Sequence, residues 1–200
     1  MTKDELRAAH LQRRRALSDE ERQSAAKAAS VLFASFVLFK RSSYCAYLSH
    51  DNEMPTRHLI RQIFAWKASL AIPAWDAQQK SYDLCAFHAQ TKLVTGKYGI
   101  REPEARHPVN PSSIRLLLIP GVAFDPDGNR VGHGKGYYDA ILSRIAHGAL
   151  KVGFCYDWQI VPSIPAEPHD IPVDFLLTDR RILCCNPKKM KSSNDANGRK

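Results

Sequence analysis

Long hydrophobic runs are absent from this sequence. No stretch of about 18 or more apolar residues occurs, and the longest apolar runs are broken by charge or proline within a few positions. Residues 1–17 have neither an apolar signal core nor a small-residue cleavage site. We therefore expect a cytoplasmic protein that makes no membrane contact.

A CxxC pair of cysteines is absent too. The five cysteines are scattered, odd in number and without a CxxC motif, which argues against a disulfide framework and against a zinc site. The histidines show no metal-ligand spacing. We expect most of the cysteines to be small, buried hydrophobic residues.

Internal repeats and an obvious linker are also missing. The 200 residues exceed the usual size of one domain but fall short of two. We predict a single α/β catalytic domain over residues 1–185. Residues 186–200 are polar, charged and aperiodic, which is typical of a disordered tail.

Positive charge is what the chain has in excess. The formal net charge is +9, which implies attraction to a polyanion. The candidates are nucleic acid, a membrane surface, and a substrate rich in phosphate or carboxylate groups. Charge alone does not choose among them.

Two capping boxes, Thr2 with Glu5 and Ser18 with Glu21, predict two helices at the start of the chain. The first helix has a basic polar face, and the second runs into an apolar segment that ends near residue 39. The cations on the face of the first helix are Lys3, Arg7, Arg14 and Arg15.

The rest of the chain alternates strand and helix patterns. Residues 115–124, RLLLIPGVAF, are the most apolar strand candidate, and such a run is expected in the centre of a sheet covered on both faces. A helix is predicted over residues 56–66, with Thr56 as a possible cap. Further strand candidates are residues 43–50, 69–75, 82–89, 151–156, 173–178 and 181–185, and the second and third of these suit a hairpin.

The segment RVGHGKGYYD, residues 130–139, follows the central strand candidate. Ligands bind at the carboxyl ends of strands in open α/β sheets. Glycine amides, Lys135 and the start of a helix predicted over residues 137–147 together suit a phosphate, and Asp139 is a candidate Mg²⁺ ligand. Two plainer interpretations stay open: glycines that only form turns, and an aspartate favoured in the first turn of a helix.

Familiar catalytic and nucleotide motifs are not found in this segment or elsewhere. No Ser or Thr follows Lys135, so the segment is not GxxxxGK[ST], and it is not GxGxxG either. No Ser-His-Asp or Cys-His arrangement can be defended from the sequence. The chemistry indicated is positioning and charge neutralisation rather than covalent catalysis.

Five motifs, in order along the chain, resemble those of the 5-formyltetrahydrofolate cyclo-ligase family, also called methenyltetrahydrofolate synthetase. The longest, PGVAFDPDGNRVGHGKGYYDAIL, spans residues 120–142 and resembles the family signature. A glycine loop alone is unspecific, whereas five ordered motifs are not expected by chance. The other four are KDELR at 3–7, EMPT at 53–56, GKYGIREP at 96–103 and VPSIPAEPHDIPVDFLLTD at 161–179.

The resemblance implies a reaction and a fold. The reaction would close 5-formyltetrahydrofolate to 5,10-methenyltetrahydrofolate, using ATP and Mg²⁺ and releasing ADP and phosphate. The fold would be a three-layer α/β sandwich with a central, mostly parallel sheet, Rossmann-like. We expect two small-molecule partners, ATP and a reduced folate, no nucleic acid, and a monomer or weak dimer.

The resemblance also implies roles for individual residues. Lys135, Arg130 and Tyr138 are expected to be catalytic, and Asp139 and Asp174 to bind the metal. The substrate-binding residues would be Glu53, Met54 and Thr56. The ATP-binding residues would be Lys3, Arg7, Gly132, His133, Gly134, Lys135, Gly136, Tyr137 and Tyr138.

Some of these assignments have open alternatives. Lys3 and Arg7 also suit a solvated basic face, and Glu53 a turn near a helix start. Of the two acidic residues in the closing segment, Asp174 is preferred to Asp170 as a metal ligand because it precedes an apolar strand. At position 133 family members commonly carry arginine; the histidine here is shorter and mostly neutral at pH 7, so its phosphate contact is expected to be weaker or pH-dependent.

Two rival functions are kept. In the first, the basic N-terminal helix and the tail bind nucleic acid, which explains the charge but leaves the glycine loop and Asp139 without a role. In the second, the protein is a small-molecule kinase of another class, which usually needs a side-chain base near the acceptor. The sequence does not place such a base.

Overall fold

A computed structural model describes residues 1–36, 39–134, 136–167 and 170–188. Its helices are α1 (Lys3–Arg15), α2 (Asp19–Ser35), α3 (Arg57–Ala65) and α4 (Tyr137–Leu142), with 3-10 turns at Lys97–Gly99, Pro111–Ser113 and Asp157–Gln159. Its strands are β1 (Ser43–Cys45), β2 (Ser69–Asp76), β3 (Ser81–Ala86), β4 (Leu93–Thr95), β5 (Arg101–Pro103), β6 (Leu116–Ile119), β7 (Ala123–Phe124), β8 (Arg130–Val131), β9 (Leu150–Phe154), β10 (Phe175–Leu177) and β11 (Ile182–Cys184).

The central sheet has seven strands in the order β11-β10-β9-β6-β1-β2-β3. The five inner strands are parallel, and the edge strands β3 and β11 pair antiparallel with their neighbours. Counted along the chain, the parallel strands lie in the order 2-1-3-4-5, which is a doubly wound arrangement. The expected α/β fold with a mostly parallel sheet is confirmed, with this strand order rather than the Rossmann order.

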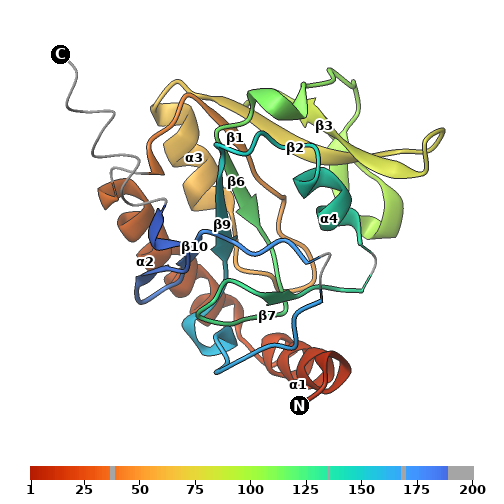
Figure 1. Ribbon diagram of the computed structural model, residues 1–200. Helices are drawn as coiled ribbons and strands as arrows, with labels where there is room; N and C mark the ends of the chain where they lie inside the picture. The colour runs from red at the N-terminus through yellow and green to blue at the C-terminus, as the bar shows by residue number, and fades with distance from the viewer. Residues whose placement is uncertain (37–38, 135, 168–169, 189–200) are drawn as a thin grey trace.

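Helices cover both faces of the sheet (Figure 1). On one face, α2 and α3 pack with Leu116 and Leu118 of β6 in a single apolar cluster, and on the other face Leu117 and Ile119 pack with Ile141 of α4. All four β6 residues are fully buried, as predicted for a central strand. The expected three layers are therefore present.

α1 lies across the carboxyl end of the sheet (Figure 1). Its apolar residue Leu6 packs with Val122, Ala123 and Val131 of the small β7–β8 hairpin. The hairpin follows β6 directly, so α1 closes over the end at which the central strands finish. This contact brings the first turns of α1 close to the glycine-rich segment.

Local signals in the sequence explain much of this arrangement. Both predicted capping boxes are formed, at Thr2 and Ser18, and the predicted β2–β3 hairpin is confirmed. All five cysteines are free, and Cys45, Cys85 and Cys155 are buried as expected. Within the described ranges no helix is both long and apolar enough to span a bilayer.

Five local predictions differ from the structure. The strand predicted over residues 115–124 is divided into β6 and β7, which belong to different sheets. Arg14 is not on an exposed polar face: it is fully buried. Thr56 stands at the start of α3 but makes no side-chain cap bond, since its hydroxyl donates to the Tyr47 carbonyl at 2.8 Å. α2 ends at Ser35 and α4 at Leu142, each earlier than predicted.

The first three residues of the expected tail, 186–188, are among the described residues. Asn186 Nδ2 donates to Asp174 Oδ1 at 3.0 Å, so the chain is still anchored to the sheet at this residue. Residues 189–200 lie outside the described residues, and the prediction for them stays a prediction.

Candidate active site

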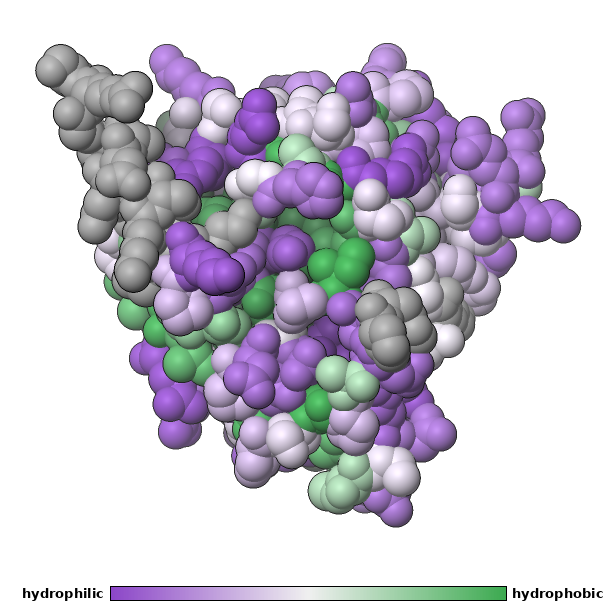
Figure 2. Space-filling model, in the orientation of Figure 1, coloured by the Kyte–Doolittle hydropathy of each residue, from purple (hydrophilic) through white to green (hydrophobic). Residues whose placement is uncertain are grey.

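A cavity of about 730 Å³ lies at the carboxyl ends of β1 and β6. These are the strands between which the sheet reverses its winding, where doubly wound folds bind ligands. The segments that follow them, at Tyr47–Leu48 and Pro120–Gly121, both line the cavity. Figure 2 shows apolar side chains in the middle of this view of the molecule, surrounded by hydrophilic ones.

One side of the cavity is basic, and we call it the phosphate side; it is formed by Lys3, Arg7, Arg130 and Gly132. Arg7 Nε donates to the Gly132 carbonyl at 2.8 Å. A methyl group added at Gly134 would lie 3.7 Å from Arg7 Nη2. The helix α1 therefore holds a guanidinium directly against the glycine loop.

The glycine loop has a backbone that only glycine adopts easily. Gly134 and Gly136 have φ of +81° and +64°, in the left-handed region where a Cβ is disfavoured. Gly132 and Gly136 have open space where a Cβ would lie. Lys135, predicted both to bind ATP and to be catalytic, lies outside the described residues.

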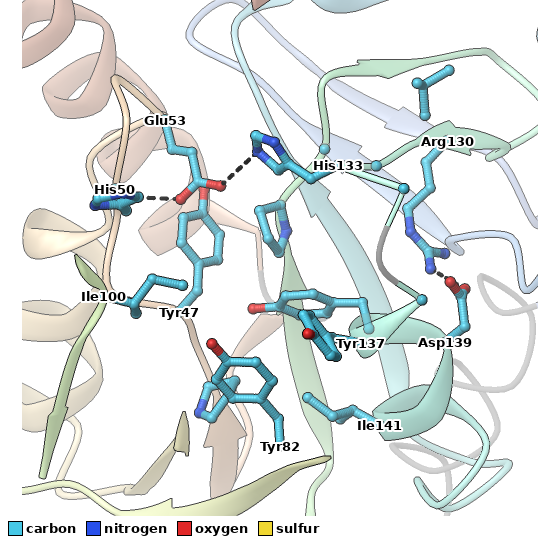
Figure 3. A pocket seen from close by; sticks show the side chains of 18 of the residues that line it. Tyr47, His50, Glu53, Tyr82, Ile100, Arg130, His133, Tyr137, Asp139 and Ile141 are labelled. Carbon is cyan, nitrogen blue, oxygen red and sulfur yellow. Dashed lines mark hydrogen bonds and ion pairs between the residues drawn. The ribbon is translucent and has the colours of Figure 1, made fainter. Parts of the chain in front are cut away.

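Arg130 and Asp139 form an ion pair on the phosphate side (Figure 3). Arg130 also donates through Nη1 to the Ile171 carbonyl at 2.8 Å, and its side chain is 8% exposed. Both residues line the cavity. A fixed, nearly buried guanidinium is suited to binding phosphate oxygens.

Lys3 forms ion pairs with two carboxylates at the cavity wall. Its ammonium lies 2.8 Å from Asp170 Oδ2 and 3.0 Å from Glu167 Oε1. Partial burial lowers the pKa of Lys3, but the hydrogen bonds to Asp170 and Glu167 outweigh it and raise the pKa overall. Lys3 is therefore a positively charged group, and an anion that binds beside it competes with these two carboxylates for its ammonium.

Glu53 lies at the end of a tight turn that follows β1. The Glu53 amide donates to the His50 carbonyl, and the Glu53 carboxylate accepts from the His50 amide, both at 3.0 Å. Asp51 and Asn52 between them have φ of +46° and +60°, a conformation that Asp and Asn tolerate better than most residues. The turn fixes where the Glu53 carboxylate points.

The Glu53 carboxylate lies on the side of the cavity opposite to Arg130 and Asp139, and His133 of the glycine loop reaches toward it (Figure 3). His133 Nε2 is 3.9 Å from Glu53 Oε1. The Glu53 side chain is 13% exposed, and burial raises its pKa to about 7, although the charge of Arg14 opposes the shift. This carboxylate titrates near neutral pH.

The remaining wall is aromatic, and together with Glu53 it forms what we call the ring side. The tyrosines that line the cavity are Tyr47, Tyr82, Tyr98, Tyr137 and Tyr138. The Tyr82 and Tyr137 rings lie 5.0 Å apart, edge to face. Burial raises the pKa of Tyr82 to about 12, and its hydroxyl is buried with no hydrogen-bond partner in the described structure. A flat, polar ring would find both a stacking surface and hydrogen-bonding groups here.

Comparison with known proteins agrees with this geometry. The sequence model of the 5-formyltetrahydrofolate cyclo-ligase family matches residues 1–179. The chain belongs to this family. The predicted identity as an enzyme of the 5-formyltetrahydrofolate cyclo-ligase class is confirmed.

Individual cyclo-ligases resemble the chain over nearly its whole length. The Escherichia coli 5-formyltetrahydrofolate cyclo-ligase is 31% identical, with 86% of this chain and 97% of the relative covered. The Mus musculus enzyme of the same name is 30% identical, with 86% and 91% covered. The NMR structure of Aquifex aeolicus 5,10-methenyltetrahydrofolate synthetase superposes with a TM-score of 0.81 at 34% identity, covering 92% of this chain and 93% of that one.

Most of the residues predicted for the cyclo-ligase site meet in the cavity. The described members of the predicted ATP set line it, as do the catalytic candidates Arg130 and Tyr138, the substrate residue Glu53 and the metal candidate Asp139. Burial raises the pKa of Tyr138 well above its usual value. A hydroxyl with a raised pKa stays protonated, which argues against a role for Tyr138 as a general base.

Met54 and Thr56 are not among the cavity-lining residues. Met54 is buried in the core cluster beneath α3, and the Thr56 hydroxyl is bonded to the backbone of Tyr47. The Met54 carbonyl accepts from the Tyr47 hydroxyl at 3.2 Å, so both residues tie the segment after Glu53 to Tyr47. The structure gives their predicted substrate contact no support.

Asp174 is also placed away from the cavity. It is buried at the start of β10, where its carboxylate accepts from the Lys151 amide at 2.9 Å and from Asn186. The start of a parallel strand is at the opposite edge of the sheet from the site. Asp170, which the sequence ranks second, lines the cavity instead.

Sequence reasoning missed several residues of the site. Tyr47 lines it from the segment after β1 and Tyr82 from β3, and Glu167 contacts Lys3. Nothing in their local patterns distinguishes them from core or surface residues. The basic first helix was the main argument for nucleic-acid binding. Because Lys3 and Arg7 of this helix line the cavity, they are less available to an external nucleic acid, and the nucleic-acid hypothesis loses support.

Proposed function

We propose that the protein cyclises 5-formyltetrahydrofolate to 5,10-methenyltetrahydrofolate in a reaction that uses ATP and Mg²⁺. The observation that carries the proposal is a single cavity with two different sides. The phosphate side presents Lys3, Arg7 and Arg130 beside a glycine loop, and the ring side presents Glu53 with tyrosines. Two substrates, one a polyanion and the other a flat ring, can meet between them.

The phosphate side suits the nucleotide. Guanidinium groups on Arg7 and Arg130 are donors that match phosphate oxygens, and the glycine amides add further donors. We place the triphosphate of ATP here, with Lys135 as an additional cation on the basis of its position in the loop. The acidic partners of Lys3 and Arg130 would exchange for phosphate when the nucleotide binds.

The ring side suits the pterin. The pyrimidine edge of a pterin presents a ring N–H and an amino group side by side, and one carboxylate can accept from both. We assign this contact to Glu53, in its ionised form. Tyr82 and Tyr137 would pack against the ring.

The reaction then needs no nucleophile from the protein. The formyl oxygen attacks the γ-phosphorus, and the bond from phosphorus to the bridging oxygen of ADP breaks. N10 attacks the formyl carbon of the resulting iminium phosphate, the carbon–oxygen bond breaks, phosphate leaves and N10 loses its proton. The protein orients the two substrates and stabilises the charge of the transferring phosphoryl group.

The metal fits Asp139 best. Mg²⁺ is commonly held by one or two carboxylates together with substrate phosphates, and Asp139 lines the phosphate side. No cluster of three or more acidic, cysteine or histidine residues suited to a metal occurs within the described ranges. When bound, Mg²⁺ would neutralise charge on the phosphate oxygens.

A direct assay tests the proposed reaction. Purified protein with ATP, Mg²⁺ and 5-formyltetrahydrofolate is expected to produce the near-ultraviolet absorbance of methenyltetrahydrofolate, in amounts equal to the ADP formed. Omission of ATP is expected to abolish the signal. No absorbance increase from folded protein and fresh substrate would refute the proposal, and ATP consumption with another acceptor would favour the kinase alternative.

Asp139→Asn tests the metal assignment. The substitution preserves size but removes the charge of a metal ligand, so half-maximal activity is expected at a Mg²⁺ concentration about tenfold higher or more. The measurement is a Mg²⁺ titration at fixed ATP, with the exposed Asp127→Asn as the matched control. An unchanged titration midpoint would remove Asp139 from the metal site.

A further inference from the structure

The inner face of α1 carries basic residues along its whole length. Lys3, Arg7 and Arg14 are spaced by four and seven residues, so they lie on one face of the helix. Lys3 and Arg7 line the phosphate side of the cavity. Arg14 is 11 positions beyond Lys3, or about 16 Å along the helix axis, and its side chain is only 1% exposed.

The buried Arg14 guanidinium is poorly satisfied. Its Nη2 lies 3.5 Å from Asp51 Oδ2, and its Nε and Nη1 find no hydrogen-bond partner within the described part of the chain. Burial of an incompletely paired charge destabilises a fold. Stability therefore does not explain an arginine at this position, and a functional reason is indicated.

Arg14 reaches the turn that orients Glu53. Its partner Asp51 is the first central residue of that turn, which is closed by the Glu53 amide donating to the His50 carbonyl and by the His50 amide donating to the Glu53 carboxylate. Figure 3 shows the result, with the Glu53 carboxylate held between His50 and His133 at the cavity wall. A shift of Asp51 would move this carboxylate.

Arg14 also supplies charge where Glu53 needs it. The positive charge of Arg14 opposes the effect of burial on the pKa of Glu53, whereas the charge of Asp51 adds to that effect. The ionisable groups around Glu53 are Arg14 from α1, His50 and Asp51 from the turn, His133 from the glycine loop, Tyr47 after β1, Tyr138 from α4 and Tyr156 after β9.

We propose that Arg14 is a positioning residue for folate binding: its buried guanidinium pairs with Asp51 and so holds the His50–Glu53 turn, and with it the Glu53 carboxylate, in place. It acts through Glu53 and does not contact either substrate. The role of Glu53 toward the pterin rests on the proposed function, whereas the effect of Arg14 on Glu53 does not.

The test compares Arg14→Met, Arg14→Lys and the matched control Arg15→Met, which makes the same change at an exposed position on the same helix. For Arg14→Met we expect the acid limb of kcat/KM for 5-formyltetrahydrofolate to move to higher pH by about one unit, a loss of about fivefold at pH 7. The KM for ATP is expected to stay the same. Arg14→Lys should retain the wild-type pH profile, and Arg15→Met should match the wild type throughout.

A second readout does not depend on activity. Carbon-13 NMR of the glutamate carboxyl groups, with Glu53 assigned by its loss in Glu53→Gln, should show a higher pKa for Glu53 in Arg14→Met than in the wild type. Thermal unfolding of Arg14→Met should occur at the wild-type temperature or above it. The proposal is overturned by an unchanged Glu53 titration, and equally by an Arg14→Met variant that unfolds or loses stability, since that marks a structural role.

The two failures can be told apart. A wild-type protein without cyclo-ligase activity refutes the proposed function but leaves the NMR comparison to decide the Arg14 proposal. An active wild type with identical Glu53 titrations in wild type and Arg14→Met refutes the Arg14 proposal alone.

Discussion

Glu53→Gln is expected to lower kcat/KM for 5-formyltetrahydrofolate by about 100-fold while leaving the KM for ATP near its wild-type value. A carboxylate can accept both N–H groups of the pterin edge, and each bond to a charged group contributes about 1.5–3 kcal/mol. The glutamine side chain keeps one acceptor oxygen for one pterin N–H, but it places its NH2 donor opposite the second pterin N–H, where no hydrogen bond can form. The combined loss of about 3 kcal/mol corresponds to the stated factor.

The pH dependence provides an internal check on Glu53. Because burial raises its pKa to about 7, the carboxylate that accepts the pterin forms only as pH rises through neutrality. The wild-type kcat/KM for the folate should therefore increase with pH through about 7, and this limb should vanish in Glu53→Gln. Glu20→Gln, an exposed change on α2, is the control. Wild-type kinetics in Glu53→Gln, or an acid limb that survives the substitution, would show that Glu53 does not bind the ring.

Arg7→Ala is expected to lower kcat/KM for ATP by about 100-fold, with a smaller change in the KM for the folate. The substitution removes a guanidinium from the phosphate side and also the hydrogen bond to the Gly132 carbonyl that ties α1 to the glycine loop. Loss of one preorganised donor to a developing charge typically costs about 100- to 1000-fold in rate. Arg7→Lys should recover only part of the activity, because an ammonium cannot reproduce the planar set of donors.

Asp4→Ala is the matched control for Arg7. Asp4 is the surface partner of Arg7 and its side chain is 90% exposed, so its removal leaves the guanidinium and the loop contact in place. Exposed ion pairs contribute little, and ATP kinetics within about twofold of the wild type are expected. Equal effects of Asp4→Ala and Arg7→Ala, or none in Arg7→Ala, would contradict the assignment of Arg7 to the phosphate side.

Local sequence signals predicted the helices and the sheet because their causes are local. Capping boxes at Thr2 and Ser18 depend on residues three positions apart, and the uninterrupted apolar run of β6 is sufficient to place it in the sheet centre. The glycine segment was located for a similar reason, since it directly follows that strand. These parts of the account needed no knowledge of distant contacts.

The missed features all depend on contacts between distant parts of the chain. From the helix pattern alone Arg14 is predicted to be a surface arginine. The pattern does not show that the side chain is buried and pairs with Asp51, which is 37 positions away in the sequence. The sequence ranks Asp174 above Asp170, and the structure reverses the order: Asp170 pairs with Lys3 at the cavity, whereas Asp174 accepts from the Lys151 amide at the opposite end of the parallel strands. The approach of His133 to Glu53 joins two loops 80 positions apart, which no local pattern indicates.

The transfer of the γ-phosphoryl group to the formyl oxygen is the central claim, and an isotope experiment tests it most directly. 5-Formyltetrahydrofolate labelled with oxygen-18 in the formyl group is converted by the protein with unlabelled ATP in ordinary water, and the released phosphate is analysed by mass spectrometry. The account predicts one labelled oxygen in each phosphate formed. Phosphate without the label, with oxygen-18 released into water instead, would contradict it.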